Sequence, residues 1–141
     1  MMNVSHSQFG VLDNRFLARS VGLLNPPSPF ILTGDHLVRE TIELLQKRKC
    51  GAVLICSKQG FLEGIFTERD VMYKISLNEE ATLSRPVRDF MTPNPQTVEM
   101  TSPIAYALHM MSHGGYRNIP ILDDEKIPVG LISVKDIVYY I

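Results

Sequence analysis

The feature that most restricts how this chain can fold is a seven-residue motif that occurs twice. Residues 64–70 read GIFTERD and residues 130–136 read GLISVKD, an offset of 130 − 64 = 66 residues. Both copies contain a glycine, two apolar residues, a hydroxyl-bearing residue and, three positions further on, an aspartate. A period of this size indicates that the chain consists of two copies of one structural unit.

The same offset relates the two halves of the chain without gaps from about residue 15 onward, with apolar residues and prolines in register. Corresponding pairs include Arg19 and Arg85, Val21 and Val87, Pro27 and Pro93, Val53 and Ile119, and Tyr73 and Tyr139. A chain of 141 residues has the size of one ordinary domain, so two half-sized units are expected to share it. We divide the chain into a leader and lead-in segment (1–29), a first repeat (30–76), a linker (77–85) and a second repeat (86–141).

Hydrophobic periodicity and turn residues predict the order strand, helix, strand, strand, helix in each repeat. In the first we expect a strand over 30–32, a helix over 36–48 with Asp35 as its N-cap, strands over 51–56 and 61–66, and a helix that begins at Thr67. In the second we expect a strand over 96–98, a helix that has Ser102 as its N-cap and ends at Gly114-Gly115, strands over 116–122 and 127–132, and a helix over 135–141. The predicted fold class is α/β (α+β), in two tandem pseudo-symmetric repeats.

The composition is that of a globular chain. Hydrophobic residues make up 45% of the sequence, but the apolar runs are far too short to span a membrane. The first residues contain no basic or apolar signal region, so we expect a cytoplasmic protein. A net charge of −1, spread along the chain, argues against a nucleic-acid partner, which requires a basic face. Cys50 and Cys56 flank one predicted strand, so they cannot form a disulfide with each other, and their spacing matches no zinc site.

Two interpretations of the repeated motif are open at this stage. Thr67 with Asp70, and Ser133 with Asp136, have the spacing of an N-cap and the third helical residue, which is typical of a capping box. The arrangement also suits a nucleotide, because a helix start offers N–H groups and a hydroxyl to phosphate, and a carboxylate accepts hydrogen bonds from ribose. The glycine that opens each copy would then let the chain pass close to the ligand.

The two motif copies resemble the ribose and phosphate signature of the cystathionine-β-synthase (CBS) domain. YRNIPIL at 116–122 and FMTPNPQTV at 90–98 are similar to that family's second strand and to its lead-in to a repeat. The resemblance covers residues 15–141 as a CBS domain pair, or Bateman module, and indicates a bacterial stand-alone member. It implies two α/β units around a central cleft that binds AMP, ADP, ATP, S-adenosylmethionine or another adenosyl compound. It also implies a homodimer that regulates a partner protein of unknown identity.

The resemblance further implies two ligand sites, each formed by both repeats. Contacts to phosphate, ribose and adenine in the first site fall on Thr67, Asp70, Gln96, Arg117 and Asn118. The corresponding set in the second site is Ser133, Asp136, Phe30, Gly51 and Ala52. Because Gly51 stands where the first site has Arg117, we expect a phosphorylated ligand to prefer the site of Asp70, unless Lys49 substitutes for the arginine.

Metal binding and catalysis have weaker support in the sequence. His109 and His113 lie one helical turn apart, but Met110 stands where the zinc-protease motif needs a glutamate, so we expect no metal site. The motif copies contain no histidine that could activate their hydroxyl, so we expect no enzymatic activity, no catalytic residue and no required cofactor. The main alternative is a ligand-free structural or interaction dimer whose Thr/Ser-x-x-Asp motifs are only helix caps.

Dimerisation is also favoured by apolar residues that recur near the ends of the two predicted motif helices. They are Val71, Met72 and Ile75 in the first repeat, and Ile137, Val138 and Ile141 in the second. An apolar surface that pseudo-symmetry repeats is suited to a two-fold partner, so we expect a homodimer.

Overall fold

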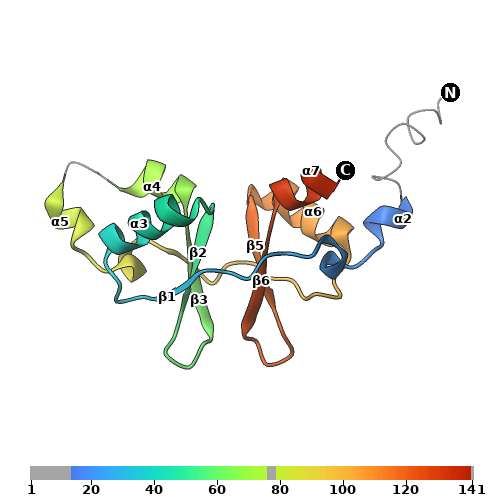
Figure 1. Ribbon diagram of the computed structural model, residues 1–141, viewed down its shortest axis with the longest axis horizontal. Coiled ribbons are helices and arrows are strands. Elements are labelled where there is room, and N and C mark those ends of the chain that lie inside the picture. Colours follow the sequence, from blue (N-terminus) through green and yellow to red (C-terminus); the bar gives the residue numbers. More distant parts are fainter. Residues whose placement is uncertain (1–13, 76–78, 141) are drawn as a thin grey trace.

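The computed structural model describes residues 14–75 and 79–140 of the chain. Two halves stand side by side, and long segments run from one half to the other (Figure 1). Residues 1–13 of the predicted leader, residues 76–78 around the start of the predicted linker, and Ile141 lie outside the described residues. No helix in the described ranges is long and apolar enough to cross a membrane.

The first repeat has the predicted order of elements. They are β1 (Ile31–Thr33), α3 (Val38–Arg48), β2 (Ala52–Cys56), β3 (Leu62–Thr67) and α4 (Glu68–Lys74). Strand β1 pairs parallel with β2, and β2 pairs antiparallel with β3. Gly60 has a φ of 98° in the turn between β2 and β3, a conformation that glycine adopts without strain. Every residue of β2 is buried, as its apolar sequence predicts.

The second repeat contains α6 (Ile104–Gly114), β5 (Asn118–Leu122), β6 (Pro128–Ser133) and α7 (Val134–Tyr140). The strand predicted over 96–98 is wrong, because only an isolated parallel bridge between Val98 and Ile121 forms. In the first repeat the N–H of Leu54 donates to the carbonyl of Phe30 at 2.9 Å. The residue that corresponds to Leu54 is Pro120, which has no N–H, so the ladder cannot extend back toward residue 96.

Each lead-in segment packs against the other repeat rather than its own. The segment with α2 (Asn14–Leu17) and the 3₁₀ helix η2 (Val21–Leu24) joins the second repeat, where the N–H of Val21 donates to the carbonyl of Ser102 at 2.8 Å. The segment with η3 (Val87–Asp89) and β4 (Thr92–Pro93) joins the first repeat, where the N–H of Val87 donates to the carbonyl of His36 at 2.8 Å. Since 87 − 21 and 102 − 36 both equal 66, the exchange obeys the internal symmetry.

One crossing segment contributes a strand pair, and the other contributes a backbone hydrogen bond to a strand. β4 pairs antiparallel with β3, and the N–H of Leu131 in β6 donates to the carbonyl of Pro27 at 3.1 Å. A short helix, α5 (Glu80–Leu83), lies within the predicted linker. The two halves are therefore interlocked, because β4 extends the sheet of the first repeat and the segment before β1 is hydrogen-bonded to β6 of the second.

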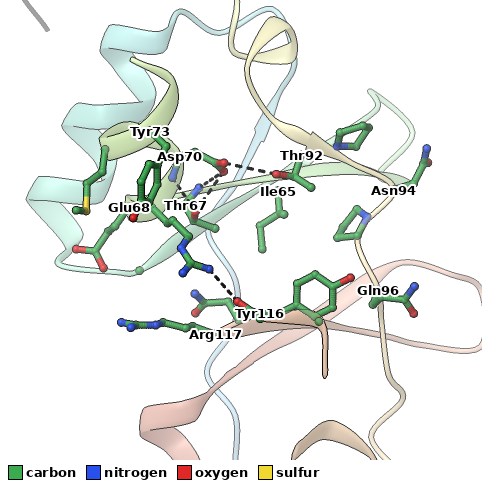
Figure 2. Close-up of a pocket in the computed structure, with 18 residues that line it drawn as sticks. Ile65, Thr67, Glu68, Asp70, Tyr73, Thr92, Asn94, Gln96, Tyr116 and Arg117 are labelled. Carbon is green, nitrogen blue, oxygen red and sulfur yellow. Dashed lines mark hydrogen bonds between the residues drawn. The ribbon is translucent and has the colours of Figure 1, made fainter. Parts of the chain in front are cut away.

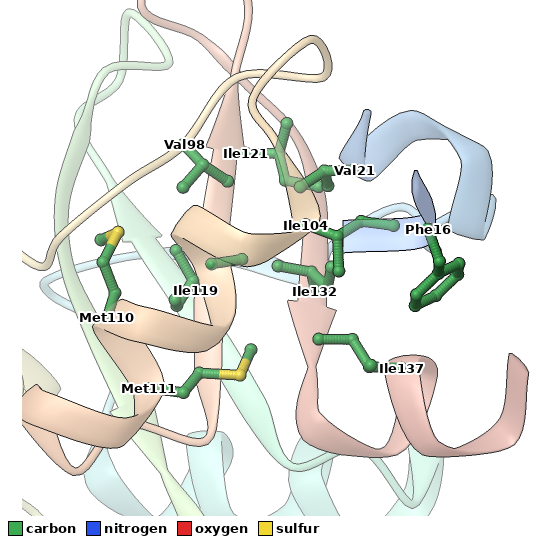
Figure 3. Close-up of a cluster of buried hydrophobic side chains, with 11 residues drawn as sticks. Phe16, Val21, Val98, Ile104, Met110, Met111, Ile119, Ile121, Ile132 and Ile137 are labelled. Atoms are coloured by element: carbon green, nitrogen blue, oxygen red, sulfur yellow. The ribbon is translucent and has the colours of Figure 1, made fainter. Parts of the chain in front are cut away.

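The described residues form three buried apolar clusters. The cluster of the second repeat includes Phe16 and Val21 from the first lead-in segment, packed with Ile104, Ile132 and Ile137 (Figure 3). The cluster of the first repeat includes Val87 from the second lead-in segment. The third cluster contains residues of β2 and β3 together with Leu131 of β6, so it holds the two halves together.

Two helix starts differ from the sequence-based expectation. Asp35 does not cap α3, which begins at Val38 with Leu37 as N-cap, and its carboxylate lies 2.7 Å from a guanidinium nitrogen of Arg88. Ser102 does not cap α6, which begins one residue later than expected, and its hydroxyl accepts the N–H of Glu99 at 2.9 Å. In both cases a tertiary or turn contact uses the side chain that could have capped the helix.

Candidate functional site

Two pockets lie between the repeats, and the 66-residue offset relates one to the other. The Asp70 pocket, of about 640 Å³, has Ile65, Thr67 and Asp70 in its wall. The Asp136 pocket, of about 860 Å³, has the corresponding residues Leu131, Ser133 and Asp136. The stretch 93–96 borders the first pocket and the corresponding stretch 27–30 borders the second. The two pockets are thus pseudo-symmetric copies, each lined by residues of both repeats.

All ten residues that the sequence suggested line the pocket to which they were assigned. The Asp70 pocket contains Thr67, Asp70, Gln96, Arg117 and Asn118. The Asp136 pocket contains Ser133, Asp136, Phe30, Gly51 and Ala52. The structure brings each set together, and their contacts with a ligand remain a prediction.

The motif itself forms a complete capping box in both repeats. The Oδ2 atom of Asp70 accepts the backbone N–H of Thr67 at 2.9 Å and its hydroxyl at 3.2 Å, and the hydroxyl accepts the N–H of Asp70 at 3.1 Å (Figure 2). Ser133 and Asp136 make the same three contacts at 2.7, 3.0 and 3.3 Å. The hydroxyl proton is therefore directed at the carboxylate and orients it.

The helix starts offer fewer free N–H groups than expected. The N–H of Glu68 donates to the carbonyl of Gly51 at 3.1 Å, and the N–H of Val134 donates to the carbonyl of Arg117 at 3.1 Å. Together with the capping box, this uses the N–H groups of the first and third helical residues. Binding of an anionic group at these helix starts would therefore depend mainly on side chains.

The second oxygen of the aspartate distinguishes the two pockets. In Asp70, Oδ1 lies 2.9 Å from Nζ of Lys74 and 3.5 Å from Oγ1 of Thr92. Asp70 is only 7% exposed, whereas Asp136 is half-buried. Among the described residues, no hydrogen-bond donor contacts Oδ1 of Asp136.

Arg117 and Asn118 border both pockets, as do Gly51 and Glu68. These four residues form a wall that the two pockets share. The sequence analysis assigned Arg117 and Asn118 to the Asp70 pocket, and the structure places them beside the Asp136 pocket as well. Lys49, which the sequence analysis named as a substitute for the arginine, also borders the Asp136 pocket, so cationic side chains lie beside both pockets.

The glycines that open the motif do not line either pocket, contrary to the expectation that they approach the ligand. A Cβ at Gly64 would lie 2.9 Å from the carbonyl oxygen of Thr92 and closer still to the Met91 side chain. A Cβ at Gly130 would lie 3.2 Å from Cδ1 of Ile121. These glycines serve the packing of strands and crossing segments.

A family model for the CBS domain matches residues 22–77 and 87–141 of the chain. The chain belongs to the CBS domain family. The two matched segments form a tandem CBS domain pair, as the sequence motifs indicated.

Relatives of known name agree with this assignment. A mitochondrial CBS domain-containing protein of Arabidopsis thaliana is 28% identical over 110 residues, which cover 75% of this chain and 53% of that protein. This CBS pair therefore spans about half the length of that relative.

Two solved structures share the fold. One is a CBS domain pair in complex with 5′-methylthioadenosine and S-adenosyl-L-methionine, with a TM-score of 0.76 at 22% identity over 86% of this chain and 98% of that chain. The other is a CBS domain protein of Pyrobaculum aerophilum complexed with AMP, with a TM-score of 0.75 at 21% identity over 83% of this chain and 88% of that chain. These similarities confirm the predicted architecture of two tandem repeats.

Several pocket residues of this CBS pair were missed by the sequence analysis. Arg69 and Tyr73 border the Asp70 pocket, and the corresponding Lys135 and Tyr139 border the Asp136 pocket. The guanidinium of Arg69 donates to the carbonyl of Gly115, across the boundary between the repeats, at 3.0 Å. The 66-residue offset could have identified these residues. It relates Arg69 to Lys135, both cationic, and Tyr73 to Tyr139.

The two cysteines of the CBS pair have different surroundings. Cys50 is half-buried and borders the Asp136 pocket, and burial is the main reason that its thiol pKa is raised. Cys56 is buried in β2, and burial raises the pKa of its thiol to about 11. Both thiols are free, in agreement with the sequence-based prediction that they do not pair.

The histidine pair lies on α6, away from both pocket linings. The rings of His109 and His113 are 3.9 Å apart between centroids, and a ring nitrogen of His113 lies 3.1 Å from the carbonyl oxygen of His109. Within the described ranges no group of three or more His, Cys, Asp or Glu side chains could hold a metal ion.

Helices α4 and α7 lie on the same side of the CBS pair (Figure 1), and both expose apolar side chains. Met72 and Tyr73 are each 76% exposed, and the corresponding Val138 and Tyr139 are 54% and 79% exposed. Ile137, by contrast, is buried, and Val71 and Ile75 pack against the core of the first repeat. Of the six apolar residues that the sequence suggested for this surface, Met72 and Val138 are exposed in the structure. The sixth, Ile141, lies outside the described residues.

Proposed function

We propose that this CBS domain pair is a regulatory module that binds an adenosyl ligand between its repeats and signals the bound state to a partner protein. The observation that carries the proposal is the pair of corresponding pockets, each with a motif aspartate, an aromatic side chain and cationic side chains in its wall. Their volumes of about 640 and 860 Å³ fall within the range of small-molecule sites, roughly 300–1,000 Å³.

The ligand class is supported by the contents of the two similar structures. One contains 5′-methylthioadenosine and S-adenosyl-L-methionine, and the other contains AMP. The adenosyl group is common to all three compounds. We therefore assign AMP, ADP, ATP or S-adenosylmethionine as the class of ligand for this chain.

Each part of the ligand has a matching group in the pockets. The motif aspartate of an occupied pocket, Asp70 or Asp136, would accept hydrogen bonds from ribose hydroxyls, with Thr67 or Ser133 holding the carboxylate in position. Gln96 and Phe30 would lie beside the adenine, and Asn118 would reach phosphate together with Arg117. Arg117 would bind phosphate, because a guanidinium makes charge-assisted hydrogen bonds to phosphate oxygens.

The thermal unfolding of the full chain tests this proposal. A ligand at about 100 times its Kd stabilises the folded state by about 2.7 kcal/mol. For a chain of this size that corresponds to a rise in Tm of about 5–10 °C. The melting curve should shift with AMP, ATP or S-adenosylmethionine, and guanosine monophosphate serves as the control for nonspecific anion binding. An unchanged Tm with every adenosyl compound at millimolar concentration would contradict the proposal.

The second candidate is a ligand-free interaction module. It is favoured by the capping boxes, since Thr67 and Ser133 satisfy the starts of α4 and α7 without a ligand. Both candidates include a homodimer that covers the apolar ends of α4 and α7, because a surface repeated by internal symmetry suits a two-fold partner. Absence of enzymatic activity, absence of a required cofactor and a cytoplasmic location stay predictions from the sequence.

A further inference from the structure

The two motif aspartates differ in the number of hydrogen-bond acceptor positions that remain open. A carboxylate has about four such positions, two on each oxygen. In both repeats the capping box occupies Oδ2 with a backbone N–H and a hydroxyl. Any ribose hydroxyl must therefore bind to Oδ1, and the surroundings of Oδ1 decide which pocket can accept a ribose.

The Oδ1 atom of Asp70 is already occupied by two donors. Nζ of Lys74 lies 2.9 Å away, and the hydroxyl of Thr92 donates to the same oxygen at 3.5 Å. Lys74 is fixed in this position, because its Nζ also donates to the carbonyl of Phe90 at 3.0 Å and to the hydroxyl of Thr92 at 3.3 Å (the Thr92 contact with Asp70 is visible in Figure 2). A ribose would have to displace a charged donor from a carboxylate that is nearly buried.

The corresponding positions around Asp136 supply no such donors. Tyr140 takes the place of Lys74, since 140 − 74 = 66, and its ring stacks on Phe16 with 5.3 Å between centroids. Pro26 takes the place of Thr92 and has no hydroxyl. Within residues 14–75 and 79–140, Oδ1 of Asp136 has no hydrogen-bond donor, so both of its acceptor positions face the Asp136 pocket or solvent.

We propose, on the basis of the function proposed above, that Lys74 decides which pocket is used. The Asp136 pocket binds the adenosyl ligand, and Lys74 with Thr92 closes the Asp70 pocket to ribose. Phosphate in the Asp136 pocket meets three cations, Lys49, Arg117 and Lys135, that all border it. The preference is the reverse of the one expected from the sequence, which rested on the position of Arg117.

Calorimetric titration of the full chain with AMP tests the assignment. The expected result for the wild-type chain is one AMP bound per chain. Asp136→Ala weakens this binding by at least about tenfold, as expected for loss of hydrogen bonds to a charged group. Asp70→Ala, which changes the corresponding residue, leaves it within about twofold. Thermal unfolding of each variant without AMP shows whether it remains folded.

The chain itself supplies a matched exchange between the repeats. Lys74→Tyr installs the residue found at the corresponding position and raises the stoichiometry from one AMP to two. Tyr140→Lys places an ammonium four residues after Asp136. The affinity for AMP should fall by about tenfold or more, because the ammonium occupies Oδ1 of Asp136. Tyr140→Leu removes the ring without adding a charge, and it retains the affinity of the wild-type chain.

Cys50 reports the occupied pocket without any variant, because it borders the Asp136 pocket and not the Asp70 pocket. AMP slows the reaction of Cys50 with an alkylating reagent, with a midpoint at the calorimetric Kd. An unchanged rate at saturating AMP, loss of tight binding in Asp70→Ala, or two equal sites in the wild-type chain each overturns the assignment while leaving adenosyl binding intact. Absence of binding by any adenosyl compound overturns the proposed function itself and the assignment with it.

Discussion

Gly51 and Arg117 occupy corresponding positions in the two repeats, and both border both pockets. The shared wall therefore holds one guanidinium where full symmetry would place two. The carbonyls of the two residues make the same contact, each accepting the first N–H of the following motif helix at 3.1 Å. The backbone contacts of Gly51 and Arg117 are thus equivalent, but only Arg117 carries a charge. Substitutions at these two positions therefore test phosphate recognition.

Arg117→Ala should weaken the binding of AMP by about 10- to 100-fold and leave the binding of adenosine nearly unchanged. A hydrogen bond to a charged group contributes about 1.5–3 kcal/mol, and each 1.4 kcal/mol is about tenfold in affinity. Calorimetric titration with both ligands measures the ratio. Arg39→Ala is the control, because Arg39 pairs with Glu80 on the surface and lines neither pocket. Equal losses for AMP and adenosine would show that Arg117 does not contact phosphate.

Gly51→Arg should have the opposite effect and raise the affinity for AMP, relative to that for adenosine, by about tenfold. A Cβ at Gly51 makes only ordinary contacts, because it would lie 3.4 Å from Oε1 of Glu68 and 3.6 Å from the side chain of Asn118. The same pair of titrations measures the change. If the ratio of the two affinities stays at the wild-type value, the wall is not where phosphate binds.

Gly64→Ala should destabilise the fold more than Gly130→Ala, although the two glycines correspond. The new Cβ at position 64 would meet the carbonyl oxygen of Thr92 at 2.9 Å, which is backbone and cannot rotate away. At position 130 the nearest atom is Cδ1 of Ile121 at 3.2 Å, at the flexible end of a side chain. Overpacking of this kind costs about 1–3 kcal/mol. Urea unfolding of both variants gives the comparison, and equal midpoints would contradict it.

Cys56 should make the free energy of unfolding fall with pH in alkaline solution. Its thiol pKa rises from an ordinary 9.0 to about 11 in the folded state, because it is buried. Between pH 9 and 11 the unfolded chain therefore loses a proton that the folded chain retains, and the folded state loses stability as pH rises. Urea unfolding at pH 8 and pH 10 measures the slope. Cys56→Ala should reduce it, and an identical slope in that variant would refute the assignment.

Val138→Asp should convert the proposed homodimer into a monomer. Val138 is exposed and borders neither pocket, so the change introduces a charge into the apolar surface of α7 without touching a ligand residue. Phe61→Asp is a matched control, because Phe61 is equally exposed but lies in the turn between β2 and β3. Sedimentation velocity at micromolar concentration distinguishes the two states. A wild-type chain that is already monomeric would exclude the homodimer.

The repeated unit and the order of its elements were accessible from the sequence, because periodicity and turn chemistry are local. The ten pocket residues followed instead from the resemblance of the motifs to the CBS domain. The expected strand over 96–98 failed for a non-local reason. Its ladder depends on an N–H at position 120 of β5, and Pro120 supplies none. The effect of Pro120 on residues 96–98 becomes apparent only once it is known that the two segments lie side by side.

The exchange of the lead-in segments was likewise not predictable from local patterns. Val21 and Val87 are apolar in the sequence, and this predicts that they are buried but not which repeat buries them. The contact of Lys74 with Asp70 could be suspected from its spacing along α4, but the hydroxyl of Thr92 reaches the same oxygen from a segment that crosses over from the second repeat. The closure of the Asp70 pocket thus depends on tertiary structure.

The central claim is that the cleft between the two repeats binds an adenosyl compound. Isothermal titration of the full chain with AMP, ATP and S-adenosylmethionine tests it most directly, with guanosine monophosphate as the control. At least one adenosyl compound should bind saturably, the compounds that bind should compete with one another, and binding should be lost in the double variant Asp70→Ala with Asp136→Ala. Absence of binding at millimolar concentration for all three compounds, or binding that survives in the double variant, would contradict it.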